Sequence, residues 1–314
     1  MLSHSCPPIL FLIFNRPNLA QQVFASIREA KPTLLFVAAD GPRDDRPGEA
    51  EKCEQARRII EAVDWDCEVL TLFREKNLGC GRGPSSAIDW FFEHVEAGVI
   101  LEDDCVPHPD FFTFCASLLN RYENDTRVSV ITGNNFQGGR KRGDAAYYFS
   151  KYNHVWGWAT WRRAWQKNDR ALAFWPGWKG SASWARYMPD KIERRYWTDI
   201  FDRMYRNETD IWDYHWTGSV WYHGGLTATP NVNLVTNIGF GPDGTHTVAS
   251  EDQEGLPVHP LGPLTHPEKV IQDRKADRYV FDHSFGGLHK RLHRRLLALP
   301  RRIARKLVRS IFRS

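Results

Sequence analysis

The sequence contains no pair of cysteines in CxxC spacing, and its start lacks the features of an export signal. Its six cysteines are scattered, which excludes the usual zinc-binding spacings. The opening MLSHSCPPILFLIFNRP has no basic segment, and its apolar run is too short for a signal peptide or a membrane-spanning helix. We therefore expect reduced cysteines and a cytoplasmic protein.

The composition also lacks the bias of a disordered or fibrous chain, with 42% hydrophobic and 25% charged residues. A chain of 314 residues has room for one large α/β domain or two small ones. Tryptophan is frequent, with 13 copies, most of them between Trp156 and Trp221. Aromatic-rich clefts often bind sugars or bases, but large aromatic side chains also dominate core packing.

Acidic residues are absent from the tail, residues 287–314, which contains ten Lys and Arg. The whole chain carries a net charge of +4, so subtracting these ten charges leaves −6 for the rest. Leucine and isoleucine recur every three to four residues in the tail, which predicts a basic amphipathic helix interrupted at Pro300. Such helices bind anionic membrane surfaces. The alternatives are binding to a nucleic acid or another polyanion, with nucleic acid the less expected partner, and a solubilising role.

Apolar runs alternate with stretches of helical periodicity in the first part of the chain. This alternation predicts an α/β fold, a single Rossmann-like domain whose mostly parallel central sheet is covered on both faces. Asn18 is expected to cap the first helix, and NLGCGRG at 77–83 reads as a glycine-rich turn without Walker-loop spacing. The predicted strands are 8–14, 34–39, 67–73, 98–101 and 128–132, and the predicted helices are 19–30, 49–63, 84–97 and 110–122.

Three adjacent carboxylates, Glu102, Asp103 and Asp104, follow the apolar strand at 98–101. Because like charges repel, this acidic trio predicts a bound cation, and oxygen ligands favour Mg²⁺ or Mn²⁺. An acidic cap on the following helix is the alternative. Arg16 and Asp40 also follow predicted strands, so we expect them at the same edge of the sheet, where ligands of such folds bind.

Several motifs together resemble the A-type nucleotide-diphospho-sugar glycosyltransferases, in particular the N-acetylglucosaminyltransferase that starts N-glycan branching. The resemblance spans roughly residues 7–247, and VILEDDCVPHPDFF, a DXD-like motif, is its most specific part. The other motifs are individually weak but follow the family's order: PILFLIFNRP, VAADGPR, EKNLGCGRG, VSVITGNNF, VWGWATWRRAW, IWDYHW and NIGFGPDGTHT.

The resemblance implies roles for individual residues. Arg16 and Asp40 would contact the nucleotide base and ribose, and Glu102 and Asp103 the donor. Asp104 would hold the metal, Asp213 would be the base, and His246 would be a further ligand of the metal or the diphosphate. By residue type, the aromatic side chains of Trp156, Trp158, Trp161 and Trp212 could stack on sugar faces, and Gly157 would allow close approach. Each residue also has an ordinary explanation: surface pairing for Arg16, a turn for Asp40, a backbone contact for Asp213 and an exposed site for His246.

The resemblance divides the chain into a transferase domain at 1–250, a proline-rich connection at 251–286 and the tail at 287–314. Residues 1–135 would bind the nucleotide sugar and 136–250 the acceptor. The function expected is a metal-dependent, inverting glycosyltransferase that uses a UDP-sugar and Mn²⁺ or Mg²⁺. A lipid-linked acceptor in bacterial surface-polysaccharide assembly would suit a peripheral membrane location. The alternatives are a sugar-nucleotide pyrophosphorylase, although the first strand lacks its glycine-rich basic signature, and a non-catalytic membrane- or polyanion-binding protein.

Overall fold

The computed structural model describes residues 6–240 and 255–298, with side chains as far as residue 292. Its centre is an eight-stranded sheet in the order β3-β2-β1-β4-β8-β6-β9-β7. Its strands are β1 Ile9–Ile13, β2 Leu34–Ala39, β3 Glu68–Phe73, β4 Ala97–Glu102, β6 Val128–Thr132, β7 Tyr147–Ser150, β8 Trp158–Trp161 and β9 Leu226–Pro230. Strands β5 (Cys105–Pro107) and β10 (Val235–Asn237) form a separate antiparallel pair.

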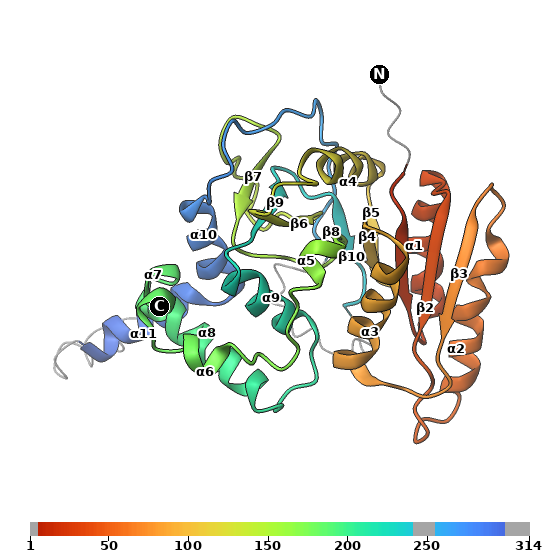
Figure 1. Ribbon diagram of the computed structural model, residues 1–314, viewed down its shortest axis with the longest axis horizontal. Helices are drawn as coiled ribbons and strands as arrows, with labels where there is room; N and C mark the ends of the chain where they lie inside the picture. Colours follow the sequence, from red (N-terminus) through yellow and green to blue (C-terminus); the bar gives the residue numbers. More distant parts are fainter. Residues whose placement is uncertain (1–5, 241–254, 299–314) are drawn as a thin grey trace, which may run out of the picture.

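The sheet is mostly parallel. Strands β1 to β4 run parallel to one another, as do β6 and β9, whereas β8 and β7 are antiparallel to their neighbours. This arrangement confirms the predicted α/β class. In Figure 1 the red-to-orange strands β1 to β3 lie on one side of the molecule and the green-to-cyan strands β7 and β9 on the other. One sheet therefore runs through both the early and the late parts of the chain.

Helices cover both faces of the sheet. One face packs against α1 and α4, and the opposite face packs against α3 and helices of the second half. The helices are α1 Pro17–Ala30, α2 Glu49–Arg57, α3 Gly79–His94, α4 Pro109–Arg121, α5 Arg162–Trp165, α6 Trp175–Trp178, α7 Ala182–Tyr187, α8 Lys191–Tyr205, α9 Asp213–Tyr222, α10 Arg274–Ser284 and α11 Gly287–Ala298, with a 3₁₀ turn at Arg58–Ala62.

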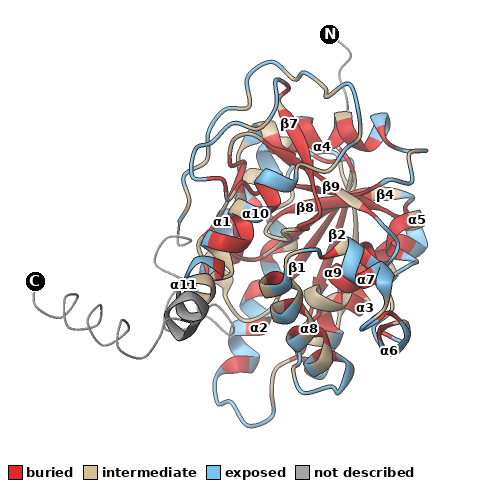
Figure 2. Ribbon diagram, turned by 90° about the vertical axis from the view of Figure 1, so that its left-hand side faces the viewer, coloured by how far each residue is buried: buried red, intermediate tan, exposed pale blue. Residues whose placement is uncertain are grey.

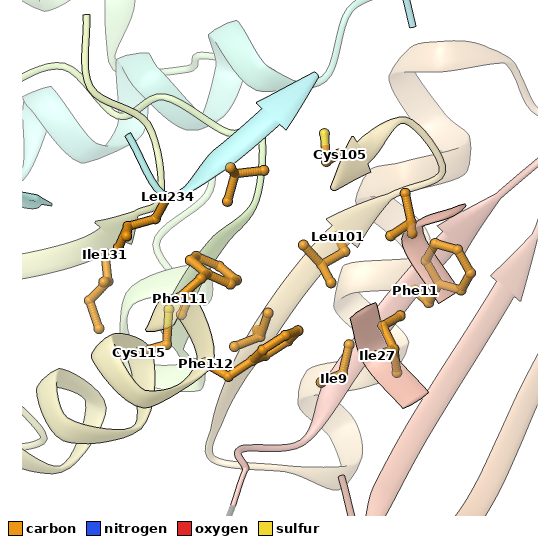
Figure 3. Packing of buried hydrophobic residues seen from close by; sticks show 14 of the residues in the cluster. Ile9, Phe11, Ile27, Leu101, Cys105, Phe111, Phe112, Cys115, Ile131 and Leu234 are labelled. Atoms are coloured by element: carbon orange, nitrogen blue, oxygen red, sulfur yellow. The ribbon is translucent and has the colours of Figure 1, made fainter. Parts of the chain in front are cut away.

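The core follows from the alternation of side chains along buried strands. In β1, Ile9 and Phe11 point to the α1 and α4 face, and Leu10 points to the α3 face. Figure 3 shows Ile9 and Phe11 beside Ile27 of α1. Figure 2 shows the buried strands at the centre, with exposed residues on the outer helix surfaces. Each such apolar side chain contributes about 1.5–3 kcal/mol to stability when it is fully buried.

The first helix begins earlier than predicted. It starts at Pro17, with Arg16 in the capping position, so the predicted Asn18 cap is wrong. Proline favours the first helical position because its fixed φ suits the helix and its missing N–H would have no partner there. The predicted helix at 49–63 is also divided, into α2 and a 3₁₀ turn.

The predicted glycine-rich turn is largely helix, because α3 begins at Gly79. The carboxylate of Asp40 accepts the N–H of Leu78 at 2.9 Å, and that of Asp210 accepts the N–H of Gly81 at 2.9 Å. These distant carboxylates satisfy N–H groups that a helix start leaves without partners. A Cβ atom at Gly79 or Gly81 would overlap Asp210, so the glycines make room for a protein side chain.

Two parts of the later chain are more ordered than predicted. Strands β7, β8 and β9 complete the sheet, although no strand was expected there. The predicted connection at 251–286 includes α10, whose Asp277 is buried and accepts the hydroxyl of Ser150 at 2.6 Å. Val280 and Phe281 join the core, so this segment packs against β7 and is not simply a surface connection.

Candidate active site

A cavity of about 410 Å³ lies where β1, β2 and β4 end. We call it the strand-end cavity. Arg16, Asp40 and the acidic trio all line it, so the structure brings together the residues that the strand-end argument placed at one edge. Apolar side chains from the strands form its floor, among them Leu12, Ile13, Ala38 and Leu72. This is the position at which open α/β sheets bind ligands.

Arg16 is the cation that contacts the acidic trio. Its guanidinium pairs with Asp103 and lies 2.9 Å from Oδ2 of Asp104. Burial opposes the charge of Arg16, but the two aspartates outweigh that effect and raise its pKa. The guanidinium of Arg16 is therefore occupied by the two aspartates. To contact a nucleotide base directly, it would have to divide its hydrogen bonds between the base and the aspartates, or break its ion pairs with them.

Asp103 and Asp104 are buried and Glu102 is partly buried, which places the negative charges of the acidic trio in an unfavourable environment. Burial, followed by repulsion from Asp104 and Asp103, raises the pKa of Glu102 to about 8. Burial also raises the pKa of Asp103 to about 6, although Arg16 opposes the shift. Arg16 supplies a single positive charge, so among the described residues it does not fully compensate the carboxylates of the acidic trio.

Asp104 is held by the segment that follows β10. Its Oδ1 accepts the amide N–H of Asn237 at 3.2 Å, and its carbonyl accepts the N–H of Ile238 at 2.8 Å. A Cβ atom at Gly239 would overlap the Asp104 carboxylate. The first residues of NIGFGPDGTHT therefore fix the orientation of Asp104. His246, from the same motif, lies outside the described residues.

Asp40 has a structural contact as well as a place in the cavity. Its carboxylate accepts N–H groups of Gly41 and Leu78, both near 3.0 Å, and so joins β2 to the start of α3. Burial raises its pKa despite these hydrogen bonds. Asp40 therefore has a structural role in joining two elements, while its side chain also lines the strand-end cavity.

Sequence reasoning missed Arg43, Arg74 and Asp210, which also line the strand-end cavity. Arg43 is fixed by Glu49, whose Oε2 accepts its backbone N–H at 2.7 Å and its side-chain Nε at 3.0 Å. Arg43 lowers the pKa of Glu49 to about 2. Arg74 directly follows β3, so the strand-end argument that selected Asp40 would have found it. No sequence signal joins Asp210 to this site.

The donor groups suit a divalent cation that is shared with a phosphate ligand. Among the described residues, five carboxylates and three guanidiniums line the cavity, so a diphosphate would add to an existing excess of negative charge. Within the same described ranges, no three His, Cys, Asp or Glu groups form a complete metal site. Magnesium is usually held by one or two carboxylates together with substrate phosphates, which fits Asp104 and its neighbours.

Asp213 begins α9, and the residue before it contacts the acidic trio. The preceding Trp212 donates its indole N–H to Oε1 of Glu102 at 3.3 Å. The negative charge of Asp213 contributes to the raised pKa values of Glu102 and of Cys80, which lines the strand-end cavity. Burial raises the pKa of Asp213 itself to about 6. Its Oδ1 is buried and has no hydrogen-bond partner in the described part of the chain.

The predicted sugar-stacking tryptophans separate into two groups. Trp158 is fully buried, and Trp212, which is 4% exposed, stacks on it at 5.8 Å. Trp161 is also buried, with the Arg163 guanidinium 4.3 Å from its ring centroid. The stacking prediction is therefore wrong for these three rings, because core packing occupies them. Only Trp156 of this set is partly exposed.

Gly157 has a packing role that explains its residue type. Its φ is +73°, which favours glycine, and a Cβ atom there would lie 2.7 Å from Cγ2 of Val235.

Trp156 and Asp213 line a second cavity, of about 300 Å³. Tyr152 and Trp197 are among its other lining residues, and we call it the aromatic cavity.

The described start of the tail is attached to the body. Arg291 lies 2.6 Å from Asp190 and 2.7 Å from Asp282. Leu288 and Leu292 are 43% and 54% exposed. Pro300, the predicted break in the tail, lies outside the described residues. None of the helices in the described ranges has the length and hydropathy needed to span a membrane.

No family model matches the chain, and no curated protein matches it. Among solved structures, it is similar to the inositol-1-phosphate CTP transferase from T. maritima, with 13% identity, 77% of this chain and 93% of that chain covered, and a TM-score of 0.40. It is similar to mouse xyloside xylosyltransferase 1, with 10% identity, coverages of 70% and 83%, and a TM-score of 0.36. The glycosyltransferase GlyE of Streptococcus pneumoniae TIGR4 shows 7% identity, coverages of 72% and 45%, and a TM-score of 0.32. All three are transferases by name, but the likenesses are too distant to carry an argument about this chain.

Proposed function

We propose that this protein is a transferase that uses a nucleotide sugar, and specifically a glycosyltransferase of the inverting kind. The nucleotide diphosphate of the donor, expected to be a UDP-sugar, would bind in the strand-end cavity. A hydroxyl group of the acceptor would attack the sugar directly, with Asp213 as the base. The observation that carries the proposal is the buried Oδ1 of Asp213, which has no described hydrogen-bond partner and belongs to the residue after Trp212, whose indole N–H is donated to Glu102.

The proposed base has the properties that the reaction needs. A carboxylate whose pKa is raised to about 6 by burial is ionised near neutral pH and is a stronger proton acceptor than an exposed aspartate. When the acceptor hydroxyl attacks the anomeric carbon, Asp213 would take its proton as the sugar–phosphate bond breaks. A single base is sufficient for direct displacement, and direct displacement inverts the anomeric centre.

The charges of the strand-end cavity make a divalent cation part of the proposal. Asp104, with Asp103 or Glu102, would hold Mn²⁺ or Mg²⁺. The ion would neutralise negative charge on the departing diphosphate. Arg16 would compensate the remaining carboxylate charge, and Arg43 and Arg74 stand at the same cavity to contact phosphate or base.

The basic tail indicates where we expect the protein to act. Residues 287–314 would bind an anionic membrane at its inner face, and the exposed Leu288 and Leu292 agree with an apolar side of such a helix. A lipid-linked acceptor would then be presented at the membrane surface. Removing residues 287–314 should abolish binding to vesicles that contain phosphatidylglycerol; unchanged binding would contradict the proposed location.

The first experiment is calorimetric titration with UDP, GDP and CDP, with and without Mn²⁺. We expect one nucleotide to bind, to require Mn²⁺, and to lose its affinity in Asp104→Ala. The matched control is Asp64→Ala, which removes an exposed aspartate paired with Arg28. Failure of all three nucleotides to bind folded protein would overturn the proposed function.

The products distinguish transfer from the pyrophosphorylase alternative. A glycosyltransferase releases a nucleoside diphosphate from the nucleotide sugar, whereas a pyrophosphorylase consumes or releases pyrophosphate. We expect nucleoside diphosphate to appear in proportion to glycosylated acceptor. Pyrophosphate-dependent formation of a nucleoside triphosphate would instead establish the alternative.

A further inference from the structure

The aromatic cavity contains an amide that the fold does not use. Asn153 is 7% exposed and lines this cavity. Its Nδ2 and Oδ1 are both buried, and neither has a hydrogen-bond partner among the residues that the structure describes. Leaving a buried polar group without a partner is costly for folding, so a side chain with two such atoms facing a cavity indicates a ligand that supplies the partners.

The other groups of the aromatic cavity define the chemistry of that ligand. Trp156 is partly exposed and, with Phe136, Tyr196 and Phe285, supplies apolar ring surface. Burial lowers the pKa of His154 to about 3, so its imidazole is neutral near pH 7. Asp213 is then the charged group among the described lining residues, and its negative charge repels anions. These groups favour a ligand that is not an anion and that has apolar faces and groups able to form hydrogen bonds, of which a neutral sugar is an example.

We propose that the aromatic cavity is the acceptor site, that it accepts a neutral sugar ring, and that Asn153 selects the acceptor by hydrogen bonding to its hydroxyl groups. This inference rests on the proposed function. An amide can donate to one hydroxyl and accept from another, which suits a vicinal pair. The volume of about 300 Å³ is at the small end of ligand sites, which run from roughly 300 to 1,000 Å³, and suits a single ring better than a long glycan.

Trp212 and Asp213, which are adjacent in the chain, connect the surroundings of the two cavities. Trp212 contacts Glu102 on the donor side, and Asp213 lines the acceptor side. A hydroxyl bound in the aromatic cavity would therefore lie within reach of Asp213, the proposed base. Tyr152 and Trp197 form a rigid wall there, since both are almost completely buried.

The test measures glycoside binding by saturation-transfer NMR. The probes are methyl β-D-glucopyranoside, methyl β-D-galactopyranoside and methyl N-acetyl-β-D-glucosaminide, with methyl β-D-glucuronide as the anionic counterpart. We expect at least one neutral glycoside to bind and the glucuronide not to bind. Asn153→Ala should weaken that binding about tenfold, as expected for the loss of hydrogen bonds to a ligand.

The melting temperature shows whether Asn153 is instead a structural residue. Because its amide atoms have no partners in the described structure, Asn153→Ala should melt at the same temperature as the wild type or higher. Asn153→Asp keeps the side-chain shape and should also weaken glycoside binding. The matched control is Asn168→Ala, which removes another buried amide oxygen without a described partner, outside the aromatic cavity, and should leave binding unchanged.

The possible outcomes separate this inference from the proposed function. If a nucleotide binds with Mn²⁺ but no neutral glycoside binds, the acceptor assignment is wrong and the transferase proposal stands. Glycoside binding that survives both Asn153 substitutions, or a preference for the glucuronide, would also overturn the assignment. If both variants melt well below the wild type, Asn153 supports the fold and is not the selecting residue. If neither nucleotide nor glycoside binds, the proposed function itself fails.

Discussion

Trp212 donates its indole N–H to Glu102 at 3.3 Å, and this contact joins the start of α9 to the end of β4. It fixes the residue that precedes Asp213, which lines the aromatic cavity. The substitution Trp212→Phe keeps an aromatic ring against Trp158 but removes the donor. We expect about 1 kcal/mol lower stability and about tenfold slower transfer, because the base would be less well positioned. Thermal unfolding and initial rates measure the two effects.

Trp165→Phe is the matched control for this prediction. Trp165 donates its indole N–H to Oδ1 of Asp89 at 2.8 Å, so it also loses a hydrogen bond to a carboxylate, but outside the proposed site. Its stability should fall by a similar amount while transfer stays unchanged. Equal losses of rate in both variants would show that the contact between Trp212 and Glu102 has no special effect on positioning.

Asp213 should control the pH dependence of transfer. A base must be ionised, and burial raises the pKa of Asp213 to about 6, so the rate should fall about tenfold for each pH unit below 6. Asp213→Asn should reduce transfer at least about 100-fold at every pH while nucleotide binding persists. Asp199→Asn, at an exposed aspartate of α8, is the control. A flat rate between pH 5 and 8 would contradict the assignment.

Glu102 should destabilise the protein at high pH in the absence of bound ligands. Its folded pKa is raised to about 8, so its ionised form is disfavoured by folding. The free energy of unfolding should therefore be lowest above pH 8 and should rise as the pH falls from 8 towards the ordinary value near 4.5. Glu102→Gln should raise stability at pH 9 by on the order of 2 kcal/mol and have little effect near pH 4.

Urea unfolding at several pH values measures this difference. Glutamine keeps an oxygen that can accept the N–H of Trp212, so the comparison isolates the charge. Glu96→Gln is the control, because Glu96 is an exposed residue directly before β4. If Glu102→Gln were destabilising at pH 9, the carboxylate would be favourably compensated, and the unbalanced charge inferred for the acidic trio would be wrong.

Gly239 should matter for metal-dependent nucleotide binding. A Cβ atom at this position would overlap the carboxylate of Asp104, so Gly239→Ala should displace that side chain. We expect at least about tenfold weaker nucleotide binding in the presence of Mn²⁺, because the carboxylate is the proposed ligand of the ion. Gly177→Ala is the control, since a Cβ atom there meets no atom within 4 Å. Equal nucleotide affinity in both variants would show that Asp104 is not a ligand of the ion.

The first half of the fold could be predicted because its signals are local. The strands Leu34–Ala39 and Val128–Thr132 have the predicted bounds, since continuous apolar runs between turn residues are typical of buried strands. The meeting of Arg16, Asp40 and the acidic trio followed from a general property of parallel sheets. Their roles in binding remain predictions.

The remainder depends on contacts between distant parts of the sequence. Strands β7 and β8 have four residues each, too few for a clear periodic pattern. The start of α3 depends on Asp40 and Asp210, which no nearby residue predicts. Residue type did not show which tryptophans are buried. The unpartnered amide of Asn153 could not be recognised without the cavity around it.

The contacts of Arg291 with Asp190 and Asp282 have a consequence for how an acceptor would be found. They fix the beginning of α11 to the body a few residues after Phe285, which lines the aromatic cavity. A helix that is fixed to the body in this way and binds the membrane as proposed would orient the aromatic cavity relative to the membrane surface as well as attach the protein to it. The search for acceptor would then take place in two dimensions, and its rate would depend on the density of acceptor in the membrane plane, not on a concentration in bulk solution.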